Sequence, residues 1–387
     1  MKRVTGHYEK TTVAGEEVSA FVPFSLPPKN PKFTMTTQCE KLLQKAKINL
    51  QQLEVVKDII PSLDWFIYSF VRKEAVTSSQ IEGTQATLVD LLTFESNSKP
   101  SKDNPNIEEV CNYLDAIKYA REQLNNKKGL PLSMRLLNNT HKRLMTGSRG
   151  KNKQPGQIRT SQNWIGGTKP GNAVFVPAPP HKLNKLLSDF EKYIHSHDKI
   201  HPLIKTGLLH VQFETIHPYL DGNGRIGRLL ITLLLEHWHL ISEPLLYLSV
   251  FLKKHRQEYY RQLENVRLNG DFEGWILFFL EGIITIAEES MALAKNLSNL
   301  VANDRKTVLS QTQTSAFTMR LFEQLPLHPI MTMSLALNLL NTTKPTALKA
   351  ISSLEETKIL SEISGKKKDR IYAYTDYLDL LKIGTEL

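Results

Sequence analysis

Apolar residues recur at three- and four-residue spacing through most of this 387-residue chain, and this periodicity constrains its fold more than any other feature. Residues three and four positions apart share one face of a helix, so the spacing predicts amphipathic helices. The pattern is clear from Thr36 to about Leu92 and recurs in six later segments: 107–124, 133–144, 181–195, 202–214, 225–238 and 274–300. The sequence therefore predicts a mostly α-helical protein.

Residues 147–180 interrupt this periodicity with six glycines and five prolines. Within them, residues 163–165 and 173–176 can pair as two short strands across residues 166–172, which predicts a short β-hairpin. The first 35 or so residues contain four prolines and predict an extended arm that leads into the helices.

The tail from about residue 303 has its own pattern. It predicts a helix at Met331–Leu340, a turn, and a second helix at Pro345–Glu356. Two strands, 359–363 and 370–374, then flank a basic turn, which is the outline of a winged helix. We thus predict three parts: an N-terminal helical region (1–105), a core with its following helices (106–302) and a winged-helix domain (303–387).

Composition narrows the location of the protein. Two cysteines, Cys39 and Cys111, are too few for a disulfide scaffold and fit a reducing compartment. The longest apolar runs fall short of the roughly 20 residues that span a bilayer. Because the first ten residues also lack the apolar segment of a secretory signal, we expect a soluble, cytoplasmic protein with no membrane partner.

The residues best suited to chemistry lie in the segment His-Pro-Tyr-Leu-Asp-Gly-Asn-Gly-Arg-Ile-Gly-Arg, residues 217–228. Gly222, Asn223 and Gly224 keep side-chain bulk low, so backbone N–H groups can converge on an anion. The helix that begins there adds unpaired donors and a positive dipole end. Arg225 and Arg228 are three residues apart on that helix and can clamp a polyphosphate.

Two further side chains complete this pattern. Asp221 would repel a phosphate unless a cation lies between them, and Mg²⁺ commonly uses one or two carboxylates plus substrate phosphates. His217 can accept a proton at neutral pH because the ordinary histidine pKa is about 6.5. The alternative is a tight glycine turn between two helices, capped by His217 and Asp221. We predict a phosphate-transfer centre, and the sequence contains no Walker-type P-loop motif.

This segment resembles the signature of Fic-domain proteins, His-x-Phe-x-(Asp/Glu)-Gly-Asn-Gly-Arg-x-x-Arg, with Tyr219 in place of the phenylalanine. The aromatic residue anchors the loop in the core, so a tyrosine serves if its hydroxyl reaches a partner or water. The resemblance implies a helical fold, with a short β-hairpin flap, that transfers AMP from ATP to a Ser, Thr or Tyr hydroxyl of a protein.

By this resemblance, the residues of the segment divide the work of the reaction. His217 is the base, Asp221 holds Mg²⁺, Gly222, Asn223 and Gly224 bind phosphate, and Arg225 and Arg228 hold the leaving phosphates. Tyr259, beside Tyr260, would wall the adenine pocket or, alternatively, belong to the core.

Two other segments are similar to known Fic elements. Ser78-Ser79-Gln80-Ile81-Glu82-Gly83 matches the inhibitory helix, in which Glu82 would pair with Arg228 and block productive ATP binding. An ordinary helix end at Gly83 is the alternative. Residues 156–177 resemble the flap that registers the target by strand addition, although an irregular surface hairpin is equally consistent with the sequence.

Other functions remain open: a different donor nucleotide, phosphorylation, removal of AMP, or a DNA-binding regulator whose core senses nucleotide. DNA would contact the winged helix through Lys344, Lys349 and residues 366–368, and a homodimer is also open. The distribution of the net charge of +10 along the chain argues against DNA as the first choice. Residues 121–200 hold 15 basic and 4 acidic side chains, an excess of 11, whereas residues 326–387 hold an excess of only 1. The charge therefore points first to ATP or an acidic target surface.

Overall fold

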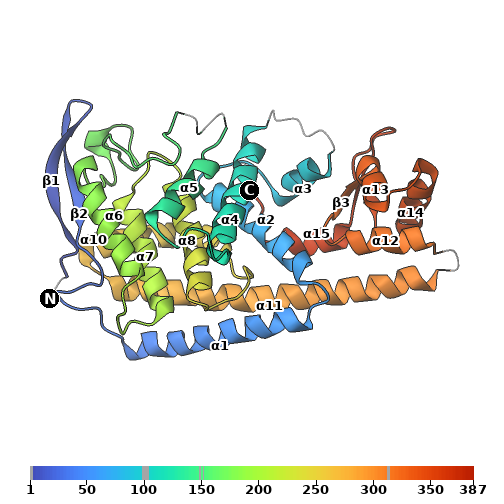
Figure 1. The fold of residues 1–387 in the computed structure, drawn as a ribbon, viewed down its shortest axis with the longest axis horizontal. Coiled ribbons are helices and arrows are strands. Elements are labelled where there is room, and N and C mark those ends of the chain that lie inside the picture. Colours follow the sequence, from blue (N-terminus) through green and yellow to red (C-terminus); the bar gives the residue numbers. More distant parts are fainter. Residues whose placement is uncertain (1–2, 98–103, 148–149, 151, 312–313) are drawn as a thin grey trace. The chain divides into compact units, whose positions relative to one another are not determined.

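Helices dominate the computed structural model, which describes residues 3–97, 104–147, 150, 152–311 and 314–387 (Figure 1). The described residues form two compact units. The first combines residues up to Gln51 with Asn112–Ile286, and the second combines Gln52–Cys111 with Ala287–Leu387. Their boundaries fall inside α1 (Thr37–Ile59), α4 (Pro105–Asn125) and α11 (Phe272–Ser310). The mostly helical fold class is confirmed, while the division into three consecutive parts stays a prediction.

The first unit is built around α7 (Pro202–Ile216) and α8 (Asn223–His237), which follow one another in sequence and pack together. Nearly every residue of α7 is buried, which is typical of a helix in the centre of a core. Gly207 allows close packing on α11, because a Cβ there would lie 2.8 Å from Ile276 Cδ1, and its carbonyl accepts a hydrogen bond of 2.8 Å from Trp275 Nε1. The remaining helices of this unit are α5 (Met134–Leu144), α6 (Pro180–Ile194), α9 (Ser249–Lys254) and α10 (Arg256–Asn269).

The N-terminal residues form a β-hairpin, so the expectation of an extended arm is wrong for residues 6–23. Strands β1 (Gly6–Val13) and β2 (Glu16–Pro23) pair antiparallel from Gly6 opposite Pro23 to Val13 opposite Glu16. The two turn residues have φ values of 48° and 84° at Ala14 and Gly15. A two-residue turn with positive φ at both positions suits the right-handed twist of paired strands.

The predicted short hairpin within residues 163–176 is present as a bridge between Ile165 and Phe175. Ile165 N donates to Phe175 O at 2.8 Å, and Val174 N donates to Ile165 O at 3.0 Å. A short helical turn, η1 (Pro170–Asn172), lies at its tip. We call residues 163–177 the flap segment from here on.

The second unit contains the predicted C-terminal elements in the predicted order. Helices α13 (Met333–Leu340) and α14 (Lys344–Glu356) are joined at Asn341, which has a left-handed φ of 47°. Strands β3 (Ile330–Thr332), β4 (Ser361–Glu362) and β5 (Ile371–Ala373) form an antiparallel sheet in the order β3-β5-β4. The other helices of this unit are α2 (Leu63–Ile81), α3 (Leu88–Ser96), α12 (Ala316–Gln324) and α15 (Thr375–Leu381). Among the helices of both units, as far as they are described, none is long and apolar enough to cross a membrane.

Candidate phosphate-transfer site

The loop between α7 and α8 begins and ends with a left-handed residue. His217 has φ 51°, and its N–H still bonds to Phe213 O at 3.0 Å, which closes α7. Gly222 has φ 78° and precedes the first residue of α8. A Cβ on Gly222 would lie 2.9 Å from Met145 Sδ and 3.3 Å from His141 Nε2. Both the backbone conformation and the surrounding space therefore require glycine at this position.

Asn223 holds the loop closed with its side chain. Its Oδ1 accepts a hydrogen bond from Tyr219 N and its Nδ2 donates to Tyr219 O, both at 2.8 Å. The side chain is buried and satisfied by these two bonds. Asn223 therefore shapes the loop with its amide, and its backbone N–H, at the first residue of α8, is the group that can face an anion.

Tyr219 anchors the loop in the core, and its hydroxyl has the partner that the sequence required. The ring is fully buried and stacks on His141, with 3.8 Å between the ring centroids and 6° between the planes. The hydroxyl donates to Asn138 Oδ1 at 2.8 Å. Burial raises the pKa of Tyr219 far above its usual value, so the hydroxyl keeps its proton.

His141, on α5, is a loop-positioning residue that the sequence pattern does not reveal. Its Nδ1 accepts a hydrogen bond of 2.9 Å from Gly156 N, so Nε2 carries the proton and donates to Asp221 O, also at 2.9 Å. Burial lowers the pKa of His141 to about 4, which keeps the ring neutral at pH 7. One imidazole thus ties the carbonyl of Asp221 to the turn at Gly156.

Arg159 is a second positioning residue without a local sequence signal. Its guanidinium is buried and donates to three carbonyls: His217 O at 2.9 Å, Ala178 O at 2.6 Å and Ser161 O at 3.3 Å. Burial lowers its pKa to about 10, so it stays charged at neutral pH. Arg159 N also donates to the carbonyl of Pro218 at 3.0 Å, which joins the chain leading into the flap segment to the loop between α7 and α8.

The charged residues of the signature lie together at the start of α8. The side chain of Asp221 is 46% exposed, whereas Arg225 and Arg228 are buried, with only 4% and 3% of their surface exposed. Asp221 Oδ1 accepts from Gly222 N at 2.6 Å and lies 3.6 Å from Arg225 Nη2. The half-exposed carboxylate can offer an oxygen to a cation, with the buried guanidinium of Arg225 close by.

This donor set fits Mg²⁺ better than a softer metal. In the described part of the chain, no three His, Cys, Asp or Glu side chains gather closely enough to form a protein cage for a metal. Magnesium needs no such cage, because it keeps several waters and takes phosphate oxygens in addition to one or two carboxylates.

Tyr259, on α10, lies in the core and is linked to α8 through His210. It is 1% exposed, and its hydroxyl donates to His210 Nε2 at 2.8 Å, while His210 Nδ1 donates to Gly227 O at 2.9 Å. These bonds join α10, α7 and α8, and burial lowers the pKa of His210 to about 4. A contact between Tyr259 and adenine stays a prediction; its neighbour Tyr260 is 43% exposed.

The three residues predicted to inhibit lie at the end of α2 in the second unit. Ser78 is fully buried, Glu82 is exposed at the helix C-cap, and Gly83 has a left-handed φ of 96°. The helix does end at this glycine, as either interpretation of the segment requires. The approach of Glu82 to Arg228 stays a prediction.

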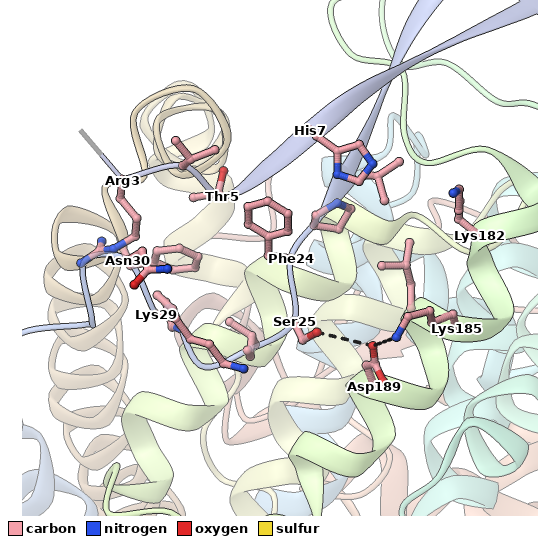
Figure 2. A pocket seen from close by; sticks show the side chains of 17 residues that line it. Arg3, Thr5, His7, Phe24, Ser25, Lys29, Asn30, Lys182, Lys185 and Asp189 are labelled. Atoms are coloured by element: carbon pink, nitrogen blue, oxygen red, sulfur yellow. Dashed lines mark hydrogen bonds and ion pairs between the residues drawn. The ribbon is translucent and has the colours of Figure 1, made fainter. Parts of the chain in front are cut away.

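A large pocket lies elsewhere in the first unit, and none of the predicted site residues lines it. Its volume is about 690 Å³, and its walls come from residues 3–30, α6 and the start of α11 (Figure 2). On one wall, Asp189 accepts hydrogen bonds from Lys185 at 3.0 Å and Ser25 at 3.4 Å (Figure 2). This pocket is therefore separate from the loop between α7 and α8 that carries the predicted site residues.

The structure is thus a helical fold with a glycine-containing turn between two core helices. Residues 40–122 match the model of the Fic/DOC family N-terminal domain, and residues 131–235 match the model of the Fic/DOC family. The chain therefore contains a Fic domain, preceded by a Fic/DOC family N-terminal domain.

Curated relatives named protein adenylyltransferase Fic share part of the chain. Those of Culex quinquefasciatus and Aedes aegypti are each 28% identical over 206 residues, which is 52% of this chain and 38% of the relative. The relative of Drosophila grimshawi is 26% identical over the same length. The match thus spans less than half the length of these relatives.

Solved structures show the same fold over more of the chain. A Fic family protein from Desulfovibrio desulfuricans superposes with a TM-score of 0.58 and 20% identity, covering 88% of this chain and 97% of that one. A Fic domain containing signaling protein from Bacteroides thetaiotaomicron gives a TM-score of 0.52 and 18% identity, over 67% of this chain and 95% of that one.

Proposed function

We propose that this protein transfers AMP from Mg-ATP to a Ser, Thr or Tyr hydroxyl of a target protein, and also to itself. The observation that carries the proposal is the loop between α7 and α8. The eight residues 217–224 include a histidine, a half-exposed carboxylate and the first N–H groups of α8, and two buried arginines, Arg225 and Arg228, follow in the same helix. The adenylyltransferase relatives support the same reaction.

In this reaction, His217 takes the proton of the acceptor hydroxyl as the hydroxyl oxygen attacks the α-phosphate. A new O–P bond forms, the bond between the α- and β-phosphates breaks, and pyrophosphate leaves. The N–H groups of residues 222–224 and the α8 dipole stabilise negative charge on the phosphates. Arg225 and Arg228 hold the leaving phosphates, and Asp221 supplies the carboxylate for Mg²⁺, which neutralises phosphate charge.

Autoinhibition by Glu82 is part of this proposal. The carboxylate of Glu82 would pair with Arg228, the arginine that otherwise binds the γ-phosphate. This pair would exclude a productive ATP geometry. The similarity of residues 78–83 to the inhibitory helix, and the end of α2 with Glu82 as its C-cap, support this.

Intact mass after incubation of the Glu82→Gly protein with each nucleoside triphosphate tests the reaction. We expect a gain of one AMP with ATP and none in the Glu82→Gly, His217→Ala double variant. A gain that persists without His217 would refute its role as the base. A gain with another triphosphate, or of a phosphoryl group alone, would assign a different transfer, and loss of AMP from a modified protein would assign the reverse reaction.

A second candidate function is DNA binding by residues 303–387. Lys344 and Lys349 on α14 and the turn residues Lys366, Lys367 and Lys368 are all exposed, as a helix and wing that contact DNA must be. A gel shift with genomic fragments, with and without ATP, tests it. Tight sequence-specific binding without any transfer would favour a regulator that senses nucleotide.

For the cellular location we propose the cytoplasm, because Cys39 and Cys111 are both free thiols.

A further inference from the structure

The β1–β2 hairpin lies outside both ranges that match the family models, which begin at residues 40 and 131. It nevertheless contacts the flap segment, which by its resemblance to the Fic flap would register the target by strand addition. Phe21 N donates to Val176 O at 2.9 Å, and Phe21 also bridges Pro177 in parallel register. Strand β2 is therefore the neighbouring strand of the flap segment, which pairs in turn across Ile165 and Phe175.

Glu16, the first residue of β2, binds the tip of the flap segment. Its Oε2 accepts from Gly171 N at 2.6 Å, and its Oε1 accepts from Lys169 Nζ at 3.0 Å. A Cβ on Gly171 would lie 2.5 Å from Glu16 Oε2, so the glycine is what lets the carboxylate reach the backbone. The bonds from Lys169 and Gly171 hold the pKa of Glu16 below its usual value, and the carboxylate is charged at neutral pH.

Apolar contacts join the same two elements. Val13, Val18 and Ala20 of the hairpin form a buried cluster with Val176 of the flap segment. Trp164 and Ala173, also in the flap segment, pack against this cluster. The hairpin thus supports both halves of the flap segment.

The other side of the flap segment is bonded to the catalytic loop. Asn163 Nδ2 donates to Leu220 O at 3.2 Å and to Tyr219 O at 3.4 Å. The flap segment is consequently fixed between the hairpin on one side and the loop that carries His217 on the other. A shift of its tip changes where an added strand would lie relative to His217.

We propose that Glu16 is a positioning residue for the protein acceptor: by holding residues 169–171 it sets the register of the flap segment and therefore the KM for the acceptor. This rests on the proposed function. Glu16 contacts neither the phosphate loop nor α8 through any bond described above, so the KM for ATP and kcat at saturating acceptor should not depend on it. Because the pair is partly exposed, we expect Glu16→Ala to raise the acceptor KM about 3- to 10-fold.

The kinetic test uses the Glu82→Gly protein as the parent enzyme and the full-length His217→Ala chain as the acceptor, with labelled ATP. Glu16→Ala and Gly171→Ala should each raise the acceptor KM with the KM for ATP unchanged. Glu16→Gln keeps an oxygen for Gly171 N and should restore part of the affinity. Lys10→Ala is the matched control, since Lys10 pairs with Glu17 at 2.9 Å on the same hairpin, and both side chains are exposed.

Hydrogen exchange of the same variants gives a readout that does not require transfer. Glu16→Ala should speed exchange at the amide of Gly171, whereas Lys10→Ala should not. An unchanged acceptor KM in Glu16→Ala, or an equal rise in the KM for ATP, would overturn the proposal even if exchange at Gly171 increases. If the Glu82→Gly parent transfers no nucleotide under any condition, the proposed function itself has failed, which is a different outcome from a parent that transfers equally well with and without Glu16.

Discussion

Tyr219 is the one fixed position at which this chain departs from the family signature. Removing its hydroxyl tests how the loop is anchored. Tyr219→Phe installs the residue of the signature. The ring keeps its stacking on His141 and its contact with Phe213, whose centroid lies 6.3 Å away. The substitution removes the 2.8 Å hydrogen bond from the Tyr219 hydroxyl to Asn138 Oδ1.

The expected cost follows from the burial of the two partners. Leaving one buried hydrogen-bonding group unsatisfied costs about 1–3 kcal/mol. Tyr219 is fully buried, but Asn138 is only half-buried, so water can reach part of its amide. We therefore expect Tyr219→Phe to lower the free energy of unfolding by about 0.5–1.5 kcal/mol, the range for a net hydrogen bond.

Urea unfolding followed by circular dichroism measures this cost, and a double-mutant cycle with Asn138→Ala isolates it. The coupling energy between the two positions should equal most of the loss in Tyr219→Phe. Tyr8→Phe is the control, because Tyr8 is 57% exposed on β1, and its substitution should change stability by less than about 0.5 kcal/mol. If Tyr219→Phe is as stable as the parent, the hydroxyl does not anchor the loop and the reasoning from Asn138 is refuted.

Three further predictions concern protonation, the glycine turn and the end of α2. Burial holds the pKa of His141 and His210 at about 4, below the value of about 6.5 in an unfolded chain, so stability is fully present above pH 6.5 and is lost as pH falls towards 4. The free energy of unfolding measured with urea should therefore fall between pH 6.5 and 4, with a limiting slope near 2.7 kcal/mol per pH unit for two protons, and a flat profile would contradict the buried neutral rings. Gly222→Ala should lower auto-modification by at least about tenfold without unfolding the protein, because a left-handed φ and contact with Met145 Sδ both oppose a side chain; full activity by intact mass would show that the turn tolerates alanine. Gln80→Leu should speed hydrogen exchange in residues 82–86, because Gln80 Nε2 donates to Ala86 O and Thr385 O at 2.8 Å each; unchanged exchange would show that these bonds do not hold the end of α2.

The loop between α7 and α8 could be located from the sequence because its residues are close together in the chain. Every residue of the signature lies within twelve positions, and the loop with the first turns of α8 brings them together by chain connectivity alone. The same holds for the C-terminal helices and strands, whose capping and turn residues adjoin the elements they end. For local patterns of this kind, the sequence signal lies in the same segment as the structure that it specifies.

The residues that hold the loop in place could not be predicted in this way. His141 is 80 residues from Asp221, and Arg159 is 58 residues from His217, so both contacts depend on tertiary packing. Neither residue stands in a pattern that marks it as functional, because a buried histidine or arginine that bonds to backbone carbonyls can lie almost anywhere in a sequence. The structure shows them because both donate to carbonyls of the same loop.

The N-terminal hairpin is an intermediate case, because its existence has a local signal while its partner does not. Val18, Ala20 and Val22 alternate along β2 and are buried, and a glycine follows the end of β1, yet the nearby prolines favour an extended arm. An isolated two-stranded hairpin is at best marginally stable in water, so β1 and β2 need a surface to cover. The flap segment is held within itself by the isolated bridge between Ile165 and Phe175, so it also needs a neighbouring element for stability. Each therefore stabilises the other, and a change that loosens the hairpin at Glu16 must loosen the flap segment as well.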